Sequence, residues 1–108
     1  MTVQQLATDC QFNILNLSEP DREINGAYVG DLLSWVMGRA ECDNIWITIM
    51  SNINVIAVAS LSDVSCVLLA ENVSLEPDVL KAAKEKGINI LSTSLAAYEA
   101  AIKLSGII

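Results

Sequence analysis

The sequence predicts a single α/β domain, with a mainly parallel or mixed sheet of about five to six strands covered by helices. Its 108 residues are close to the common size of one domain. Hydrophobic residues make up 53% of the chain and aromatic residues only 5%, which indicates an aliphatic core. Helical and extended patterns also alternate along the last third of the chain, as they do in α/β folds.

The first 29 residues predict one helix and two extended segments. Apolar residues at helical spacing indicate a short helix that ends before Gln11. Residues 12–17 are typical of a strand. A turn rich in polar residues separates them from a short extended segment at 24–29.

A second helix is predicted to open at Gly30-Asp31, with Asp31 most simply its N-cap, and to end near Gly38. Residues 45–50, 55–59 and 64–69 follow as three strongly apolar runs. Because they lack clean alternation, we expect these runs to form strands buried on both faces.

The last third predicts helix, strand and helix in turn. Pro77 begins the first of these helices and Gly87 ends it, with acidic residues at the start and lysines at the end. Residues 88–91 form a short strand, and Thr93 or Ser94 then supplies the N-cap of a helix over 95–104.

Charge and composition exclude several classes of function. Thirteen acidic and six basic residues give a net charge of −7, which disfavours binding to nucleic acids or to membrane surfaces. The chain has no histidine, so it lacks the usual neutral-pH base and histidine metal ligands. We therefore expect no metal site and no cofactor.

The three cysteines predict neither a disulfide framework nor a redox motif. Cys10, Cys42 and Cys66 are odd in number and widely spaced. Cys66 lies in an apolar run, as a buried residue would, and acidic neighbours make Cys42 a poor nucleophile. No signal peptide is visible, so we expect a cytoplasmic protein.

Ligands of open α/β sheets bind beyond the carboxyl ends of the strands. Four segments with small polar residues follow predicted strands, at 26–31, 51–54, 71–74 and 92–94. The candidate ligand-binding residues in them are Asp31, Asn54, Thr93 and Ser94. Each also has a simpler interpretation, as a helix cap or as a turn residue.

Nothing in the sequence assembles a nucleophile, a base and an oxyanion stabiliser, so we expect no enzyme activity. The chain has no phosphate-binding loop. The sole reactive cluster that an enzyme could use is Tyr28, Asp31 and Ser34, provided that their loop folds inward.

Four segments together resemble the DRTGG-domain family and span nearly the whole chain in the family's order. They are residues 21–34, 46–49, 54–59 and 90–94. Asp21-Arg22 matches the start of the naming motif, but the Thr-Gly-Gly part is present only in stretched form. A histidine-proline pair expected after Met50 is replaced by other residues, so any role of that histidine is lost.

The resemblance implies a small α/β domain over residues 1–108, similar to the N-terminal domain of HPr kinase/phosphorylase and not itself catalytic. Such domains are associated with regulation and dimerisation, with adenine-nucleotide effectors bound nearby. Stand-alone members are often encoded beside iron-only hydrogenase genes, which implies a metabolic or hydrogenase-related partner.

Two functional hypotheses follow. The first is a regulatory homodimer that modulates or docks to a metabolic enzyme, with an interface that includes Trp35, Val36 and Trp46. Both tryptophans are equally well explained as core residues. The alternative is a sensor of an adenine nucleotide, with its site at the carboxyl ends of the strands.

Overall fold

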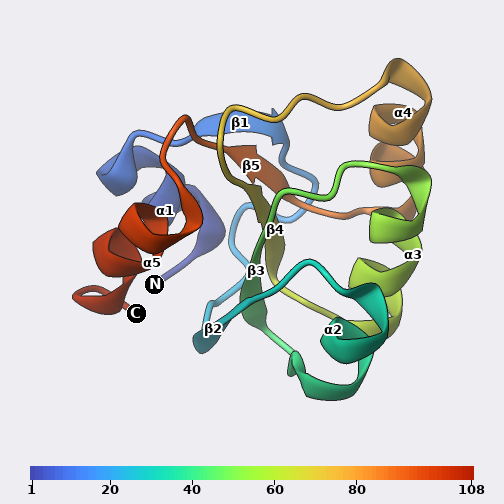
Figure 1. The fold of residues 1–108 in the computed structure, drawn as a ribbon. Coiled ribbons are helices and arrows are strands. Elements are labelled where there is room, and N and C mark those ends of the chain that lie inside the picture. Colours follow the sequence, from blue (N-terminus) through green and yellow to red (C-terminus); the bar gives the residue numbers. More distant parts are fainter.

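The structure, a computed structural model, describes residues 1–108 and contains five helices and five strands (Figure 1). In chain order these are α1 (Val3–Cys10), β1 (Asn13–Asn16), β2 (Gly26–Val29), α2 (Leu33–Arg39), β3 (Asn44–Thr48), α3 (Ile53–Ser62), β4 (Cys66–Leu69), α4 (Pro77–Lys86), β5 (Ile90–Ser92) and α5 (Ala97–Ser105). The predicted α/β domain is confirmed.

The strands form one five-stranded sheet in the order β1-β5-β4-β3-β2. Strands β2, β3, β4 and β5 are parallel to one another, and β1 pairs with β5 in the antiparallel direction. The sheet is therefore mixed and mainly parallel, as predicted.

Helices cover both faces of the sheet (Figure 1). Each of α2, α3 and α4 connects one parallel strand to the next, and all three lie on the same face. Strands β2 to β5 are added one after another in a single direction across the sheet. Right-handed crossovers between them then place all three connecting helices on the same face. Helices α1 and α5 cover the opposite face.

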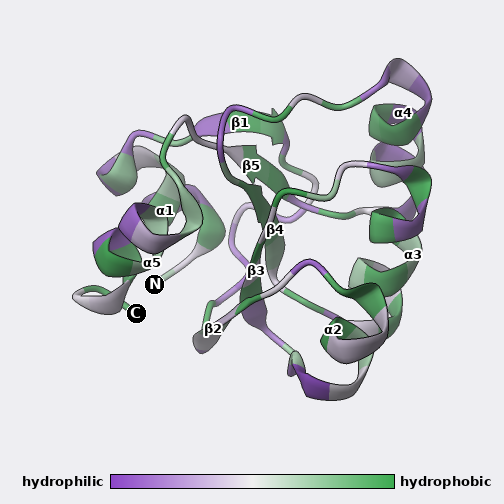
Figure 2. Ribbon diagram, viewed as in Figure 1, coloured by the Kyte–Doolittle hydropathy of each residue, from purple (hydrophilic) through white to green (hydrophobic).

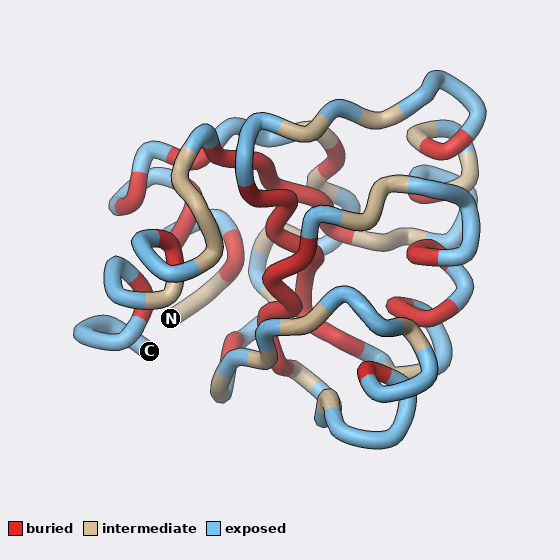
Figure 3. Tube along the Cα trace, in the orientation of Figure 1, coloured by how far each residue is buried: buried red, intermediate tan, exposed pale blue.

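The central strand β4 and its neighbour β3 are completely buried (Figure 3). Ile45 and Ile47 of β3 pack in the cluster of α1 and α5, whereas Trp46 between them packs with α2, α3 and α4. Figure 2 shows the matching run of hydrophobic residues along these strands. The expectation of strands buried on both faces is confirmed for residues 45–48 and 66–69.

Residues 55–59 were expected to form a strand, and that prediction is wrong, because they lie inside helix α3. The helix packs against both α2 and α4 as well as the sheet, so apolar residues occupy most of its circumference. This removes the helical periodicity from the sequence. Asn52 is its N-cap, and its side chain accepts a hydrogen bond from the Asn54 N–H.

Helix α4 follows the prediction closely. Pro77 is in its first turn, and Gly87 adopts the left-handed conformation at its end with φ of 70°. Helix α1 also ends as predicted, with Gln11 as its C-cap.

Arg22 ties together three loops at the edge of the sheet where the parallel strands begin. Its guanidinium contacts the carboxylate of Asp43 at 2.9 Å, that of Asp63 at 2.8 Å and the more distant Glu19 at 3.5 Å. It also donates to the Asp63 carbonyl at 2.6 Å. One side chain therefore connects the segments before β2, β3 and β4.

This cluster changes the pKa values of its members. Burial lowers the pKa of Arg22, but the hydrogen bonds to Asp63 and Asp43 outweigh this and raise it overall. The hydrogen bond from Arg22 lowers the pKa of Asp63 below its usual value. The Cys42 thiol donates a hydrogen bond to the Asp63 carboxylate at 3.3 Å. This bond raises the pKa of the thiol, so the thiol stays protonated.

The other two cysteines, Cys10 and Cys66, are buried and free. Burial raises the pKa of both thiols, so neither is a reactive thiolate. The predictions for Cys42 and Cys66 are confirmed.

Replacement of Arg22 by methionine is expected to lower the free energy of unfolding by about 2 kcal/mol, measured by urea denaturation. Breaking a fully buried ion pair costs roughly 3–5 kcal/mol, but here the acidic partners are partly exposed to solvent. Lys81→Met on the surface of α4 is the control and should change stability little. Equal effects of the two substitutions would contradict the role of Arg22.

The lowered pKa of Asp63 predicts a loss of stability in acid. Its ionised form contributes stability above the unfolded pKa of about 3.8, and this contribution disappears as pH falls below that value. Asp63→Asn should therefore lose less stability than the parent chain between pH 5 and pH 3, by about 0.5 kcal/mol. Thermal unfolding across that range is the measurement, with Asp9→Asn as the control that should behave like the parent.

Candidate functional site

The carboxyl ends of β2, β3, β4 and β5 meet along one edge of the sheet, because these four strands are parallel. The connections to α2, α3, α4 and α5 leave from this edge. Three of the four candidate ligand-binding residues, Asp31, Thr93 and Ser94, lie in these connections, and Asn54 lies in the first turn of α3.

Asp31 follows β2 and bridges to the end of β3. Its carboxylate accepts hydrogen bonds from the Thr48 hydroxyl at 2.8 Å and from the Ile49 N–H at 3.0 Å. It is not the N-cap of α2, because that position is Leu32, which makes no side-chain capping bond. Asp31 thus joins two neighbouring strand ends, and one of its oxygens is already occupied.

Thr93 and Ser94 follow β5. Thr93 is buried, and its hydroxyl accepts a hydrogen bond from the Leu95 N–H at 3.2 Å. Neither residue caps the last helix as predicted, since α5 begins at Ala97 after Ala96. The local bond at Thr93 instead shapes the turn that leads from β5 toward α5.

The structure does not gather the four predicted residues around one cavity. Asp31 lies beyond β2, Asn54 is exposed in the first turn of α3 beyond β3, and Thr93 and Ser94 lie beyond β5. Strand β4 separates the last pair from the others. None of the four lines the pocket described next.

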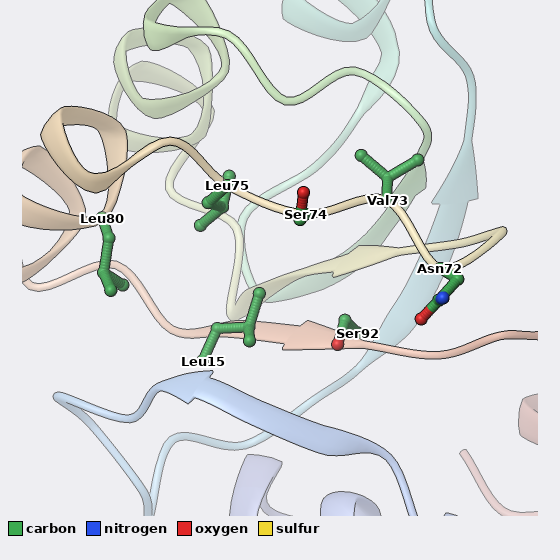
Figure 4. Close-up of a pocket in the computed structure, with 7 residues that line it drawn as sticks. All are labelled: Leu15, Asn72, Val73, Ser74, Leu75, Leu80 and Ser92. Carbon is green, nitrogen blue, oxygen red and sulfur yellow. The ribbon is translucent and has the colours of Figure 1, made fainter.

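A pocket of about 280 Å³ lies between the β4–α4 connection, α4 and the β1–β5 pair (Figure 4). Its walls are mainly aliphatic, with three small polar side chains. The lining residues are Leu15, Asn72, Val73, Ser74, Leu75, Leu80 and Ser92. Asn72, Ser74 and Ser92 belong to two polar segments that the sequence indicated, whereas the leucines gave no signal of a site.

The position of this pocket follows from the topology. After β4 the chain turns to α4 on one face of the sheet, and after the adjacent β5 it turns to α5 on the other face (Figure 1). Connections that leave neighbouring strands for opposite faces create a crevice, which is where ligands of open α/β sheets bind.

The wall formed by the β4–α4 connection contains two consecutive residues in the left-handed conformation, Glu71 with φ of 59° and Asn72 with φ of 58°. The Val73 N–H closes this turn on the Ala70 carbonyl. The turn is tied to the segment after β5, since the Asn72 N–H donates to the Thr93 carbonyl at 2.8 Å. Asparagine tolerates this conformation, but glutamate does so at a cost.

Two of the three residues predicted for a dimer interface are buried within the chain. Trp46 and Val36 have no exposed surface, so neither can contact a second copy in this conformation. Trp46 is also fixed from inside, because its indole N–H donates to the Gly30 carbonyl at 2.8 Å. Trp35, by contrast, is 54% exposed and stacks against the guanidinium of Arg39.

The structure does not join Tyr28, Asp31 and Ser34 by any hydrogen bond, and Asp31 pairs with Thr48 instead. It contains no group of three or more potential metal ligands. No helix combines the length and the apolar character needed to cross a membrane.

Comparisons with known proteins identify both a family and a fold. The model of the DRTGG domain family matches residues 6–107. A solved structure of the CBS and DRTGG domains of the regulatory region of Clostridium perfringens pyrophosphatase, complexed with the activator diadenosine tetraphosphate, has a TM-score of 0.75 at 13% identity. The alignment covers 95% of this chain but 45% of that one. No curated protein sequence matches.

Glycine at position 71 is expected to raise the free energy of unfolding by about 1 kcal/mol, because it removes the cost of a left-handed glutamate. Urea denaturation of Glu71→Gly measures the change. Glu85→Gly, inside helix α4, is the matched control and should have the opposite sign. A loss of stability in both variants would refute the strain at Glu71.

Proposed function

Because this chain belongs to the DRTGG domain family, we propose that it is a non-catalytic regulatory domain that acts as a homodimer and docks to a metabolic enzyme. The observation that carries this proposal is an unpaired, uncharged sheet edge with exposed apolar side chains beside it.

Strand β2 is at the end of the sheet and pairs only with β3. Its four residues, Gly26–Val29, include no charged residue and no proline. Natural proteins usually protect such edges with charges, prolines or bulges, because the free N–H and C=O groups of the strand can pair with another chain. Strand β2 has none of these protections.

Large apolar side chains at the carboxyl ends of β2 and β3, and at the start of the helices that follow these strands, are exposed. Val29, Leu32, Trp35, Ile49 and Ile53 form what we call the β2–α2 surface. Leu32 is 61% exposed. The preceding residue, Asp31, holds this loop against the end of β3, because its carboxylate accepts a hydrogen bond from the Ile49 N–H. Exposed apolar surface of this kind is typical of a protein interface.

Charge favours a second copy of the chain at this surface. Two molecules that each carry a net charge of −7 repel one another over most of their area. The members of the β2–α2 surface and strand β2 itself are all uncharged. Antiparallel pairing of two β2 strands across a twofold axis would extend the sheet from one molecule into the next.

The regulatory role draws on the solved pyrophosphatase structure, in which a domain of the same fold belongs to a regulatory region. For the present chain the corresponding partner is a metabolic enzyme, and the family resemblance points to hydrogenase-related electron transfer. The dimer would present two equivalent docking faces to such a partner.

An adenine-nucleotide sensor is the second candidate, and the diadenosine tetraphosphate in the pyrophosphatase structure favours it. The candidate residues for such a site, Asp31, Asn54, Thr93 and Ser94, lie along the edge where the strands end, on either side of β4. A thermal-shift series with AMP and ATP, with and without magnesium, tests this candidate. An unchanged melting temperature at millimolar nucleotide would reject it.

We expect sedimentation equilibrium to find a dimer at micromolar concentration, and Val29→Lys to convert it to a monomer. The lysine places a charge at the carboxyl end of the edge strand, within the β2–α2 surface. Leu61→Lys is the matched control, because Leu61 is 73% exposed at the far end of α3. It should leave the dimer intact.

Circular dichroism of both variants shows whether the fold is kept. A parent chain that is monomeric at high micromolar concentration would refute the homodimer. If the Val29→Lys dimer is as stable as the parent dimer, the interface does not include β2.

A further inference from the structure

Strand β1 is the second edge of the sheet, at the end opposite β2, and it pairs only with β5. Its four residues, Asn13–Asn16, include no charged residue and no proline. No hydrogen bond between backbone groups joins these residues to any segment besides β5. The outward N–H and C=O groups of β1 are therefore free to pair with another chain.

The pocket adjoins this edge through Leu15 of β1. The pairing of β1 with β5 is irregular between Ile14 and Asn16, so Leu15 has no residue directly opposite it. Its side chain packs on the face that α4 covers and lines the pocket together with Leu80 of α4 (Figure 4). Bulges next to binding sites commonly re-aim a side chain in this way.

The edge offers an apolar contact on each face of the sheet. Leu15 lines the pocket on the α4 face, whereas Ile14 is on the opposite face, because it pairs with Leu91 of the cluster that α1 and α5 cover. Ile14 is 51% exposed. A strand added beside β1 would direct successive side chains to the two faces in turn. One of its side chains would enter the pocket, and the next would cover Ile14.

The size of the pocket fits a side chain better than a whole ligand. Its volume of about 280 Å³ is just below the range of roughly 300–1,000 Å³ for small-molecule sites. The walls are mainly aliphatic, and no charged residue lines them. The pocket can therefore hold one large apolar side chain of a bound segment.

The surroundings of the pocket are acidic. Glu71, Glu76 and Asp78 are exposed on the segment that forms its wall and at the start of α4, and Lys81 is the one base on that stretch. The net charge of −7 disfavours a second copy of this chain as the occupant. A segment with basic residues on both sides of its apolar residue complements this charge.

From these observations we infer that β1 and the pocket bind an extended, basic segment of a partner protein, which adds a strand to the sheet. Main-chain hydrogen bonds to β1 hold the segment, and one bulky apolar side chain enters the pocket. Lysine or arginine residues on either side of it face the acids. The inference does not depend on the homodimer, because β1 and β2 are at opposite ends of the sheet.

The test is titration of the full chain, labelled with nitrogen-15, with a blocked pentapeptide of the order lysine, valine, leucine, valine, lysine. In an extended peptide the leucine and both lysines share one face. Saturable shifts are expected at the backbone amides of residues 13–16 and 72–75, with a dissociation constant of about 1 mM or below. A peptide with glutamates in place of both lysines should bind at least about tenfold more weakly, because like charges repel.

Two N-methylated forms of the lysine peptide test the strand pairing. Alternate N–H groups of a strand point to opposite edges, so only one set can bond to β1. N-methyl groups on both valines, or on the leucine and the last lysine, each block one set. One form should bind like the parent peptide, and the other should lose at least about tenfold in affinity.

Leu80→Lys tests the pocket, because it places a positive charge on the wall contributed by α4. It should weaken binding of the lysine peptide at least about tenfold. Leu61→Lys is the matched control on the surface of α3 and should bind like the parent chain. Circular dichroism shows whether both variants keep the fold, and the peptide series does not require either of them.

Five results would overturn the inference. The lysine peptide could cause no saturable shifts at millimolar concentration, or could shift residues 26–29 of β2 in place of β1. Equal affinities of the two N-methylated peptides would exclude an added strand. An equal affinity of the glutamate peptide would contradict the charge preference. Shifts at residues 13–16 that depend on the concentration of the chain alone would assign this edge to a second copy.

Discussion

The burial of β3 and β4 on both faces is the constraint from which the rest of the architecture follows. Residues 45–47 and 66–69 have no exposed surface, and backbone polar groups at that depth must be paired within a sheet. A single layer of helices would leave one face of these strands in water. The three crossover helices therefore cover one face, and α1 and α5, which lie at the two ends of the chain, cover the other.

The same constraint explains where the surface is left open. Three crossovers on one face carry the chain steadily from β2 to β5, so no crevice can form between the first three of these strands. The last helix must change face to complete the second layer. The crevice between the β4 and β5 connections, and the pocket in it, result from that change. At the other end of the sheet the outer side of β2 is unpaired, because β2 is the last strand in that direction.

Local signals in the sequence identified most of the fold and little of the site. Two kinds of signal depend only on residues close together in the sequence and could therefore be interpreted from it. They are the proline and glycine at the ends of α4 and the apolar runs of β3 and β4. Helix α3 could not, because it is apolar on most sides. Asp31 bonds to Thr48, 17 residues away, and the pocket combines Leu15 with Ser92; neither contact has a local signature. Burial of Trp46 likewise depends on helices distant in sequence.

Arg22 and its acidic partners give the two edges of the sheet different evolutionary freedom. Where the parallel strands begin, one guanidinium holds three loops, so a change in the length of any one of them would disturb the other two. Where the strands end, no single side chain spans the connections that surround the pocket. Insertions and substitutions can accumulate there without loss of the fold. A lineage could thus remodel the surface at the strand ends while it retains the same scaffold.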